Sequence, residues 1–252
     1  MLDLLSRIDP VLSGWTLWEG GATIDEWLAW AEAGGQEPAP IRGVPIEDAR
    51  RNMSTLVETQ VQRDDWGAPQ PDLGYSVTAS NKYNLTPRSV RVSVSAGSKF
   101  VQNWWHVDFG ELGPMPPDPS IITYPIMNGV LRAMSSIWPT PWAIVSGTAS
   151  ESESRPNTSL GFRSQTTVTT FFHQITRMGY LSADRAAGFE PPTELICERL
   201  ADGGLLMISS TERPDPANAD QMHRCDMLTK IMDRFYPDEW HKPIHRYPVE
   251  RL

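Results

Sequence analysis

Two neighbouring stretches of sequence decide the fold: Ser89-Val-Arg-Val-Ser-Val-Ser95 and Val101-Gln-Asn-Trp-Trp-His-Val-Asp-Phe109. In the first stretch every second residue is valine, and in the second the larger apolar side chains recur with the same period of two. Because successive side chains of a β-strand point to opposite faces, each stretch predicts a strand with one face toward a core. Arg91 lies on the outer face of the first strand, and Trp104, His106 and Asp108 share the outer face of the second.

Helical and strand-like segments surround this pair without regular alternation. Besides a short helix near the N-terminus, we expect three longer helices. They lie at Pro45 to about Arg63 with Met53, Leu56, Val57 and Val61 inward, at 120–136, and from Asp215-Pro216 to Pro237. We expect further strands at 142–145, 166–172 and 203–208, the last of them central in the sheet. Strands and helices that follow one another in separate runs, without regular alternation, predict a single α+β domain over residues 1–252. Its sheet should be mixed or mostly antiparallel and flanked by helices.

The composition excludes several classes of protein. The chain of 252 residues has a formal charge of -9 and only two cysteines. No stretch approaches the roughly 18 consecutive apolar residues of a membrane helix, and the first residues lack the apolar core of a secretory signal. An acidic balance disfavours direct binding of nucleic acid and suits a basic protein partner. We therefore expect a cytoplasmic globular protein that does not bind nucleic acid or membranes directly.

Two segments stand out by their polarity. Residues 18–35 belong to an acidic, tryptophan-rich N-terminal region, in which Thr23 to Glu26 reads as the capping box of a short helix. The first 40 residues carry seven acids and one base, a net charge of -6. Residues 147–157 are small, polar and acidic, which predicts a mobile loop.

One pair of residues has a spacing that suits chemistry. His106 and Asp108 lie two apart on one strand face, where they could ligate a metal or exchange a proton. A small metal-dependent hydrolase using this pair and His173 is therefore one hypothesis, although a structural role for the pair is favoured. Cys197 and Cys225 both lie among apolar residues, so we expect packed thiols rather than nucleophiles. We assign no catalytic residue, metal ligand or cofactor, and we expect a binding protein rather than an enzyme.

Several short phrases of the chain resemble the immunity protein fifty-two family, found beside toxins in bacterial polymorphic-toxin systems. The phrases are Ile8–Trp15, the strand pair Ser89–Phe109 with Gly97 between, Trp138–Ala143, Gly179–Ser182, Asp202–Ile208 and Asp215–Asn218. Together they extend over most of residues 8–235. The Trp18–Gly35 segment is longer and more acidic than the family pattern, and the histidine after the last phrase is displaced to His223.

The resemblance implies a non-enzymatic antitoxin that neutralises a restriction-endonuclease-like DNase toxin of the kind delivered by type VI secretion. An acidic protein would be steered toward the basic cleft of such a nuclease. We expect the partner to contact exposed acids and aromatic rings. The candidates are Asp25, Glu26 and Trp30 in the N-terminal helix, Asp64, Asp65 and Trp66 after the second helix, and Glu151 and Glu153 in the polar loop. An adaptor or chaperone that loads the toxin and leaves it active is a further hypothesis.

Overall fold

The computed structural model describes most of the chain, namely residues 1–19, 28–29, 32–33, 43–64, 66–83, 86–99, 103–110, 117–138, 140–149, 158–161 and 173–235. Its strands are β1 (Thr16–Trp18), β2 (Gly43–Pro45), β3 (Tyr75–Ser80), β4 (Val90–Ala96), β5 (Trp104–Phe109), β6 (Trp142–Ala149), β7 (Thr158–Gly161), β8 (His173–Leu181), β9 (Ile196–Arg199) and β10 (Leu205–Ile208). Its α-helices are α1 (Leu2–Leu5), α3 (Ile46–Ala49), α4 (Met53–Thr59), α5 (Tyr124–Ile137), α6 (Ala183–Ala186) and α7 (Ala219–Arg234). Short 3-10 helices lie at Pro10–Leu12, Arg50–Asn52, Pro71–Leu73 and Pro119–Ile121.

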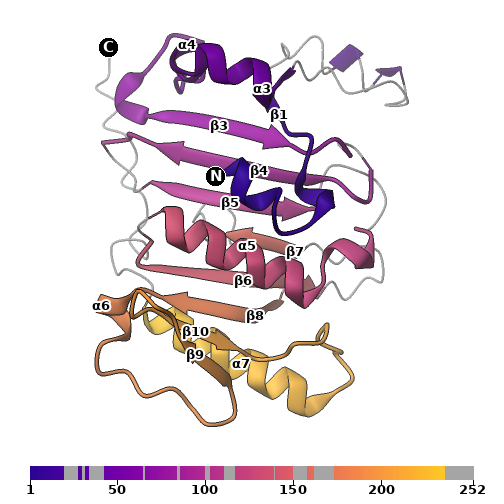
Figure 1. Ribbon diagram of the computed structural model, residues 1–252, viewed down its shortest axis with the longest axis vertical. Coiled ribbons are helices and arrows are strands. Elements are labelled where there is room, and N and C mark those ends of the chain that lie inside the picture. The colour runs from indigo at the N-terminus through magenta and orange to yellow at the C-terminus, as the bar shows by residue number, and fades with distance from the viewer. Residues whose placement is uncertain are drawn as a thin grey trace.

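The described strands form one sheet in the order β2-β1-β3-β4-β5-β7-β6-β8-β10-β9, and every pair of neighbours is antiparallel (Figure 1). Helices pack on both sides of this sheet, which confirms the α+β class. The sheet predicted as mixed or mostly antiparallel is antiparallel throughout its named pairs. None of the helices described is long and apolar enough to cross a membrane.

The two strands that decided the prediction lie side by side in the middle of the sheet. Val92 of β4 is paired with Val107 of β5. Five side chains of this apolar face are at most 1% exposed: Val90, Val92, Trp105, Val107 and Phe109. Val94, on the same face, is partly buried and packs at the margin of the core. The alternation read from the sequence is therefore confirmed, and it supplies the centre of the larger hydrophobic core.

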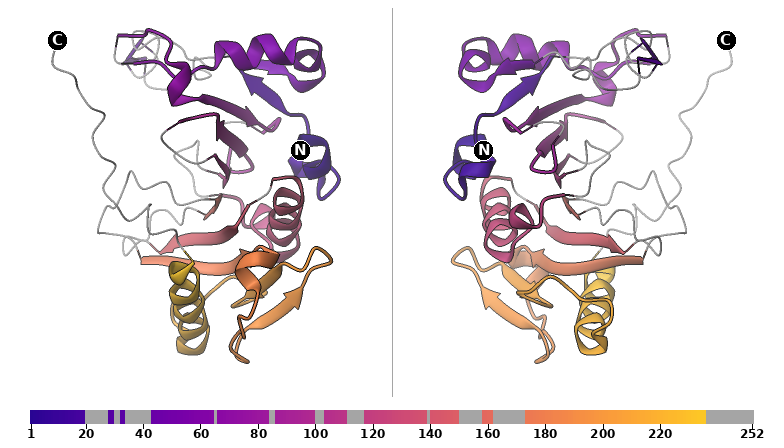
Figure 2. Two further views of the ribbon diagram at one scale, coloured as in Figure 1. Left: turned by 90° about the vertical axis from the view of Figure 1, so that its left-hand side faces the viewer. Right: turned by 90° about the vertical axis from the view of Figure 1, so that its right-hand side faces the viewer.

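Helices cover the two faces of the sheet unequally. The helices α1 and α5 lie on the apolar face, whereas α7 lies on the opposite face at the C-terminal end of the sheet (Figure 2). The helix α7 packs closely on β8, because a Cβ added at Gly179 would lie only 2.5 Å from Met232 Sδ. Four residues of α7 are buried against the sheet, as its apolar stripe predicted: Cys225, Leu228, Ile231 and Met232. A second, smaller core forms under this helix.

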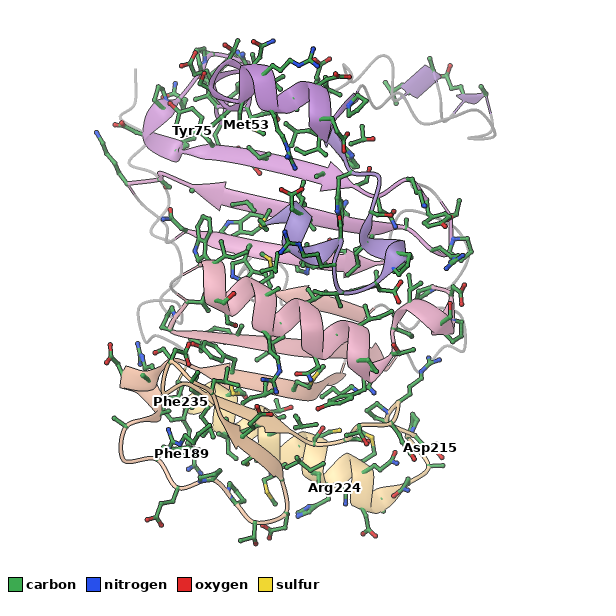
Figure 3. All side chains as sticks on the ribbon, in the orientation of Figure 1. Met53, Tyr75, Phe189, Asp215, Arg224 and Phe235 are labelled. Atoms are coloured by element: carbon green, nitrogen blue, oxygen red, sulfur yellow. The ribbon has the colours of Figure 1, made fainter. Side chains whose placement is uncertain are left out.

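The helix predicted from Pro45 to about Arg63 is wrong in its length and continuity. The segment divides into α3, a 3-10 turn and α4, and it ends at Thr59. No residue of α4 is buried, so little tertiary packing holds a longer helix together. Met53 and Leu56 still pack at the margin of the core, and α4 lies above β3 near Tyr75 (Figure 3).

Three other expectations need correction. The last helix begins at Ala219 with Asn218 as its cap, because the Asp215 carboxylate accepts the Ala217 N–H in a separate preceding turn. The predicted loop 147–157 starts too early, since residues 147–149 pair with β8 and 150–157 lie outside the described residues. The strand β10 is interior but stands next to the end of the sheet rather than at its centre. The strand expected at 166–172 and most of the segment 18–35 lie outside the described residues.

Candidate functional site

The most prominent exposed feature is a short hairpin that follows α4. The Asp64 N–H donates to Ala68 O at 3.1 Å, and the Gly67 N–H donates to Asp64 O at 2.9 Å. Gly67 has a φ of +81°, a left-handed conformation that glycine adopts without strain. Hydrogen bonds of this pattern are typical of a three-residue hairpin loop that ends in such a glycine. Backbone hydrogen bonds therefore hold Asp64, Gly67 and Ala68 together.

Trp66 stands at the tip of this hairpin and is 89% exposed. The Asp64 side chain braces the loop beneath it, because Oδ1 accepts the N–H groups of Trp66 at 3.0 Å and of Ala68 at 2.8 Å. Its Oδ2 accepts a hydrogen bond from Gln70 Nε2 at 3.1 Å. The Ala68 N–H makes the largest contribution to lowering the pKa of Asp64. Asp64 thus positions Trp66, and its carboxylate oxygens are already engaged within the loop.

The other residues predicted to contact a partner cannot be placed beside this hairpin. They are Asp25, Glu26, Trp30, Asp65, Glu151 and Glu153, and all of them lie outside the described residues. Of the eight candidates, the structure therefore describes Asp64 and Trp66 and brings these two together. The exposure of Trp66 fits its predicted role, which itself stays a prediction.

His106 and Asp108 form a second candidate cluster, on the polar face of the sheet opposite the apolar face. Two nitrogens of Arg91, Nη2 at 2.8 Å and Nε at 3.2 Å, donate to Asp108 Oδ2. His106 Nε2 lies 3.0 Å from Asp108 Oδ1, although this contact lacks the alignment of a hydrogen bond. The Asp108 side chain is only 2% exposed. A buried carboxylate held between two basic groups stabilises the pairing of β4 and β5 and is poorly placed to act as a base.

Neighbouring side chains continue this polar face across the sheet. The hydroxyls of Thr78 and Ser93 lie 3.2 Å apart, and Trp18 Nε1 donates to Ser80 Oγ at 3.0 Å. These contacts link β1, β3 and β4 through polar groups, so the face is held together by hydrogen bonds.

The backbone of His173 lies far from the His106–Asp108 pair. It lies at the start of β8, opposite Ala149, and three strand spacings separate β8 from β5. With strands about 4.8 Å apart and a rise of about 3.4 Å per residue, the backbones of His106 and His173 are on the order of 20 Å apart. Within the described ranges, no group of three His, Cys, Asp or Glu residues could hold a metal ion.

The two cysteines differ in a way that the sequence did not reveal. Cys225 is buried in α7, as predicted, and its Sγ lies 3.3 Å from Ser209 Oγ. Cys197 was expected to be packed, but this is wrong, because it lies on the exposed strand β9 at the end of the sheet. Partial burial still raises the pKa of the Cys197 thiol, which disfavours a nucleophilic role.

Sequence reasoning missed two contributions to these sites. Arg91 was predicted to point outward, but its pairing with Asp108 depends on the register between β4 and β5. The bracing role of Asp64 had a usable signal, since Asp at the first position of a turn and Gly at the fourth is a common turn signature.

No family model matches this chain, and no curated protein matches it either. The resemblance to the immunity protein fifty-two family therefore stays a prediction, supported by the short phrases of the sequence.

Proposed function

We propose that this protein is a cytoplasmic immunity protein, an antitoxin that binds and neutralises a basic, restriction-endonuclease-like DNase toxin. The observation that carries the proposal is Trp66, a large aromatic side chain displayed in solvent on a braced hairpin. The family resemblance in the sequence and the acidic charge of the chain support the same function.

A rigidly presented tryptophan is well suited to anchor a protein interface. Tryptophan is enriched among the few interface residues that carry most of the binding energy. The Asp64 carboxylate fixes the backbone on both sides of Trp66, at Trp66 itself and at Ala68. Less conformational entropy is then lost on binding, because these hydrogen bonds already restrain the backbone at Trp66 and Ala68. The indole is accordingly the first candidate to fill an apolar pocket of the partner.

The charge of the chain suits a nuclease as that partner. A DNase presents a basic surface to the phosphates of DNA, and this protein carries a formal charge of -9. Opposite charges accelerate the encounter and favour a correct orientation, and salt weakens both effects. We expect association to slow steeply as the salt concentration rises.

The test is co-expression with the toxin encoded beside this gene. The wild-type protein should restore growth, and Trp66→Ala should bind the toxin at least about 30-fold more weakly, as expected for an interface anchor. Ile137→Ala is the matched control, because Ile137 is a second exposed apolar side chain, 42% exposed, at the end of α5. Absence of growth rescue by the wild type would refute the proposal. If Trp66→Ala binds the toxin as tightly as the wild type, the proposed role of the hairpin is refuted, but the antitoxin function is not.

Two further measurements separate this function from its rivals. If the purified toxin complex still cleaves DNA, the chain is an adaptor rather than an antitoxin. If the isolated protein binds one equivalent of zinc or manganese, and His106→Ala abolishes a hydrolytic activity without unfolding the chain, the hydrolase hypothesis replaces both.

A further inference from the structure

The strand β9 leaves one edge of the sheet open. Its one neighbour in the described sheet is β10, on the inner side. All four of its residues are exposed, and the Ile196 side chain is 54% exposed. An exposed strand edge presents backbone N–H and C=O groups that readily pair with another strand.

The hydrogen bonds of the β9–β10 hairpin show which backbone groups face outward. The Leu200 N–H donates to Gly204 O at 2.8 Å, which makes these two residues a hydrogen-bonded pair in the register of the hairpin. Because such pairs alternate along antiparallel strands, Glu198 directs its backbone groups toward β10. Cys197 and Arg199 therefore direct theirs toward the open edge.

Charged side chains usually protect an edge strand from pairing. In β9 these side chains form hydrogen bonds with other parts of their own chain. Glu198 accepts hydrogen bonds from both terminal nitrogens of Arg132 in α5, one of them at 3.0 Å. The Arg199 guanidinium donates to the carbonyl oxygens of Ala186 at 3.2 Å and Phe189 at 3.3 Å. Charges held in this way oppose pairing less than free ones do.

The opposite end of the sheet differs. Its last strand, β2, is three residues long and ends in Pro45, which has no N–H to donate. The residue that follows, Ile46, donates its N–H to Trp15 O. Among the residues that the structure describes, one edge of the sheet is thus blocked and the other is open.

We propose that β9 pairs with β9 of a second copy of this chain, antiparallel and about a two-fold axis beside Cys197. Outward-facing residues must meet each other, which leaves four symmetric registers, one centred on each residue of β9. Three of them bring like charges opposite each other: Glu198 with Glu198, Arg199 with Arg199, or, when Ile196 is opposite Ile196, Glu194 with Glu198. The fourth places Cys197 opposite Cys197 and Ile196 opposite Glu198, with Leu195 opposite Arg199. It is the one register of the four that has no like-charge pair.

The first test is the mass of the reduced protein by sedimentation over a range of concentrations. Four residues bury much less than a standard interface of about 1,600 Å², so we expect a weak dimer that forms at high concentration. The mass should rise from 28.2 kDa toward twice that value. Cys197→Pro removes the outward N–H and should keep the protein monomeric, whereas the matched control Cys197→Val should still dimerise. An unchanged thermal transition verifies that each variant is folded.

The second test traps the pair covalently with diamide, which accepts the two hydrogens as the two Cys197 thiols join in a disulfide. Directly opposed residues of this kind lie about 5.5 Å apart at Cα, within the range that a disulfide bridges. A band of twice the monomer mass should appear on a non-reducing gel. Cys197→Ser should abolish it, and Cys225→Ser should not, because Cys225 is buried.

Three outcomes would overturn the proposal. The first is a monomer at every concentration with no disulfide band, and the second is a dimer that Cys197→Pro does not affect. The third is a monomeric wild type whose capture of a basic partner is lost in Cys197→Pro, which would assign the edge to a strand of that partner. None of these three outcomes depends on the growth-rescue assay. Refuting the pairing of β9 therefore leaves the antitoxin proposal intact.

Discussion

The two faces of β5 contrast sharply in how they contribute to the molecule. On one face Trp105, Val107 and Phe109 are fully buried under the helices. On the other, His106 and Asp108 alternate with them and take part in an ion-pair cluster with a neighbouring strand. A single strand of six residues therefore supports a dry core on one side and a polar network on the other.

The difference shows what stabilises each side of the sheet. Apolar burial is favourable without precise geometry, whereas buried ionic groups stabilise only when every partner is present. The polar face turns apolar only near α7, where Trp104 packs at the margin of the second core. Substitutions on the two faces should accordingly fail by different mechanisms and by different amounts.

The largest loss is expected on the apolar face. Trp105→Ala removes a fully buried ring and its hydrogen bond from Nε1 to Thr140 Oγ1, 3.1 Å long. The free energy of unfolding should fall by about 3–5 kcal/mol, measured by urea denaturation. Trp104→Ala, on the other face of the same strand and partly exposed, is the matched control and should lose less than half as much. Equal losses would mean that the two faces contribute alike.

The polar face should respond next most strongly. Asp108→Asn leaves Arg91 without its carboxylate and should lower the free energy of unfolding by about 2–3 kcal/mol, because Arg91 keeps some contact with water. The double variant with Arg91→Gln should recover part of that loss, since the charge that lost its buried carboxylate is then removed as well. If the double variant is as unstable as the sum of both single ones, Asp108 and Arg91 do not act as a pair.

A smaller effect is expected at α7, the helix that covers the second hydrophobic core. Asn218 caps α7 through Oδ1, which accepts the Gln221 N–H at 3.1 Å. Asn218→Ala should cost about 1 kcal/mol in unfolding free energy. Asp215→Ala should cost less, because Asp215 caps a turn outside the helix. The reverse order would show that α7 starts at Asp215 after all.

The smallest effect concerns Asp64, which, unlike the buried Asp108, is partly exposed. The pKa of Asp64 is lowered in the folded chain, so its bonds to the loop are intact above the usual aspartate value of about 3.9. Their contribution to stability is lost only as the pH falls through the lower folded value. The amide resonance of Ala68 should therefore shift in NMR spectra below about pH 4. In Asp64→Asn the shift should be absent, and a shift that persists would point to another group.

How far the sequence predicted the fold depended on how local each signal was. The strands β4 and β5 were predicted correctly, because the period of two is carried by the residues themselves. The start of α7 was placed one turn too early, because Asp215-Pro216 has the signature of a helix start but forms a turn of its own. The loop boundary at Gly147 failed because residues 147–149 extend β6 through pairing with β8, which is tertiary.

The candidate sites show the same difference between local signals and features that depend on tertiary pairing. The position of Trp66 beside two aspartates suggested an exposed ring, and the ring is exposed. Cys197 was misjudged because its apolar neighbours suggested a core, and only the order of strands shows that β9 ends the sheet. The Arg91–Asp108 pair likewise needed the register between two strands. Properties that depend on which strands are neighbours were beyond the sequence alone.

The order of the strands also has a consequence for synthesis on the ribosome. Every named strand pair joins strands that are adjacent or next but one in the chain, from β1 to β10. A nascent chain emerging at about 5–20 residues per second can therefore extend the sheet outward from β1 by one strand or one hairpin at a time. The growing sheet would start at the acidic N-terminal end and finish with the β9–β10 hairpin and α7. The edge that is open in the finished protein is then the last to be built.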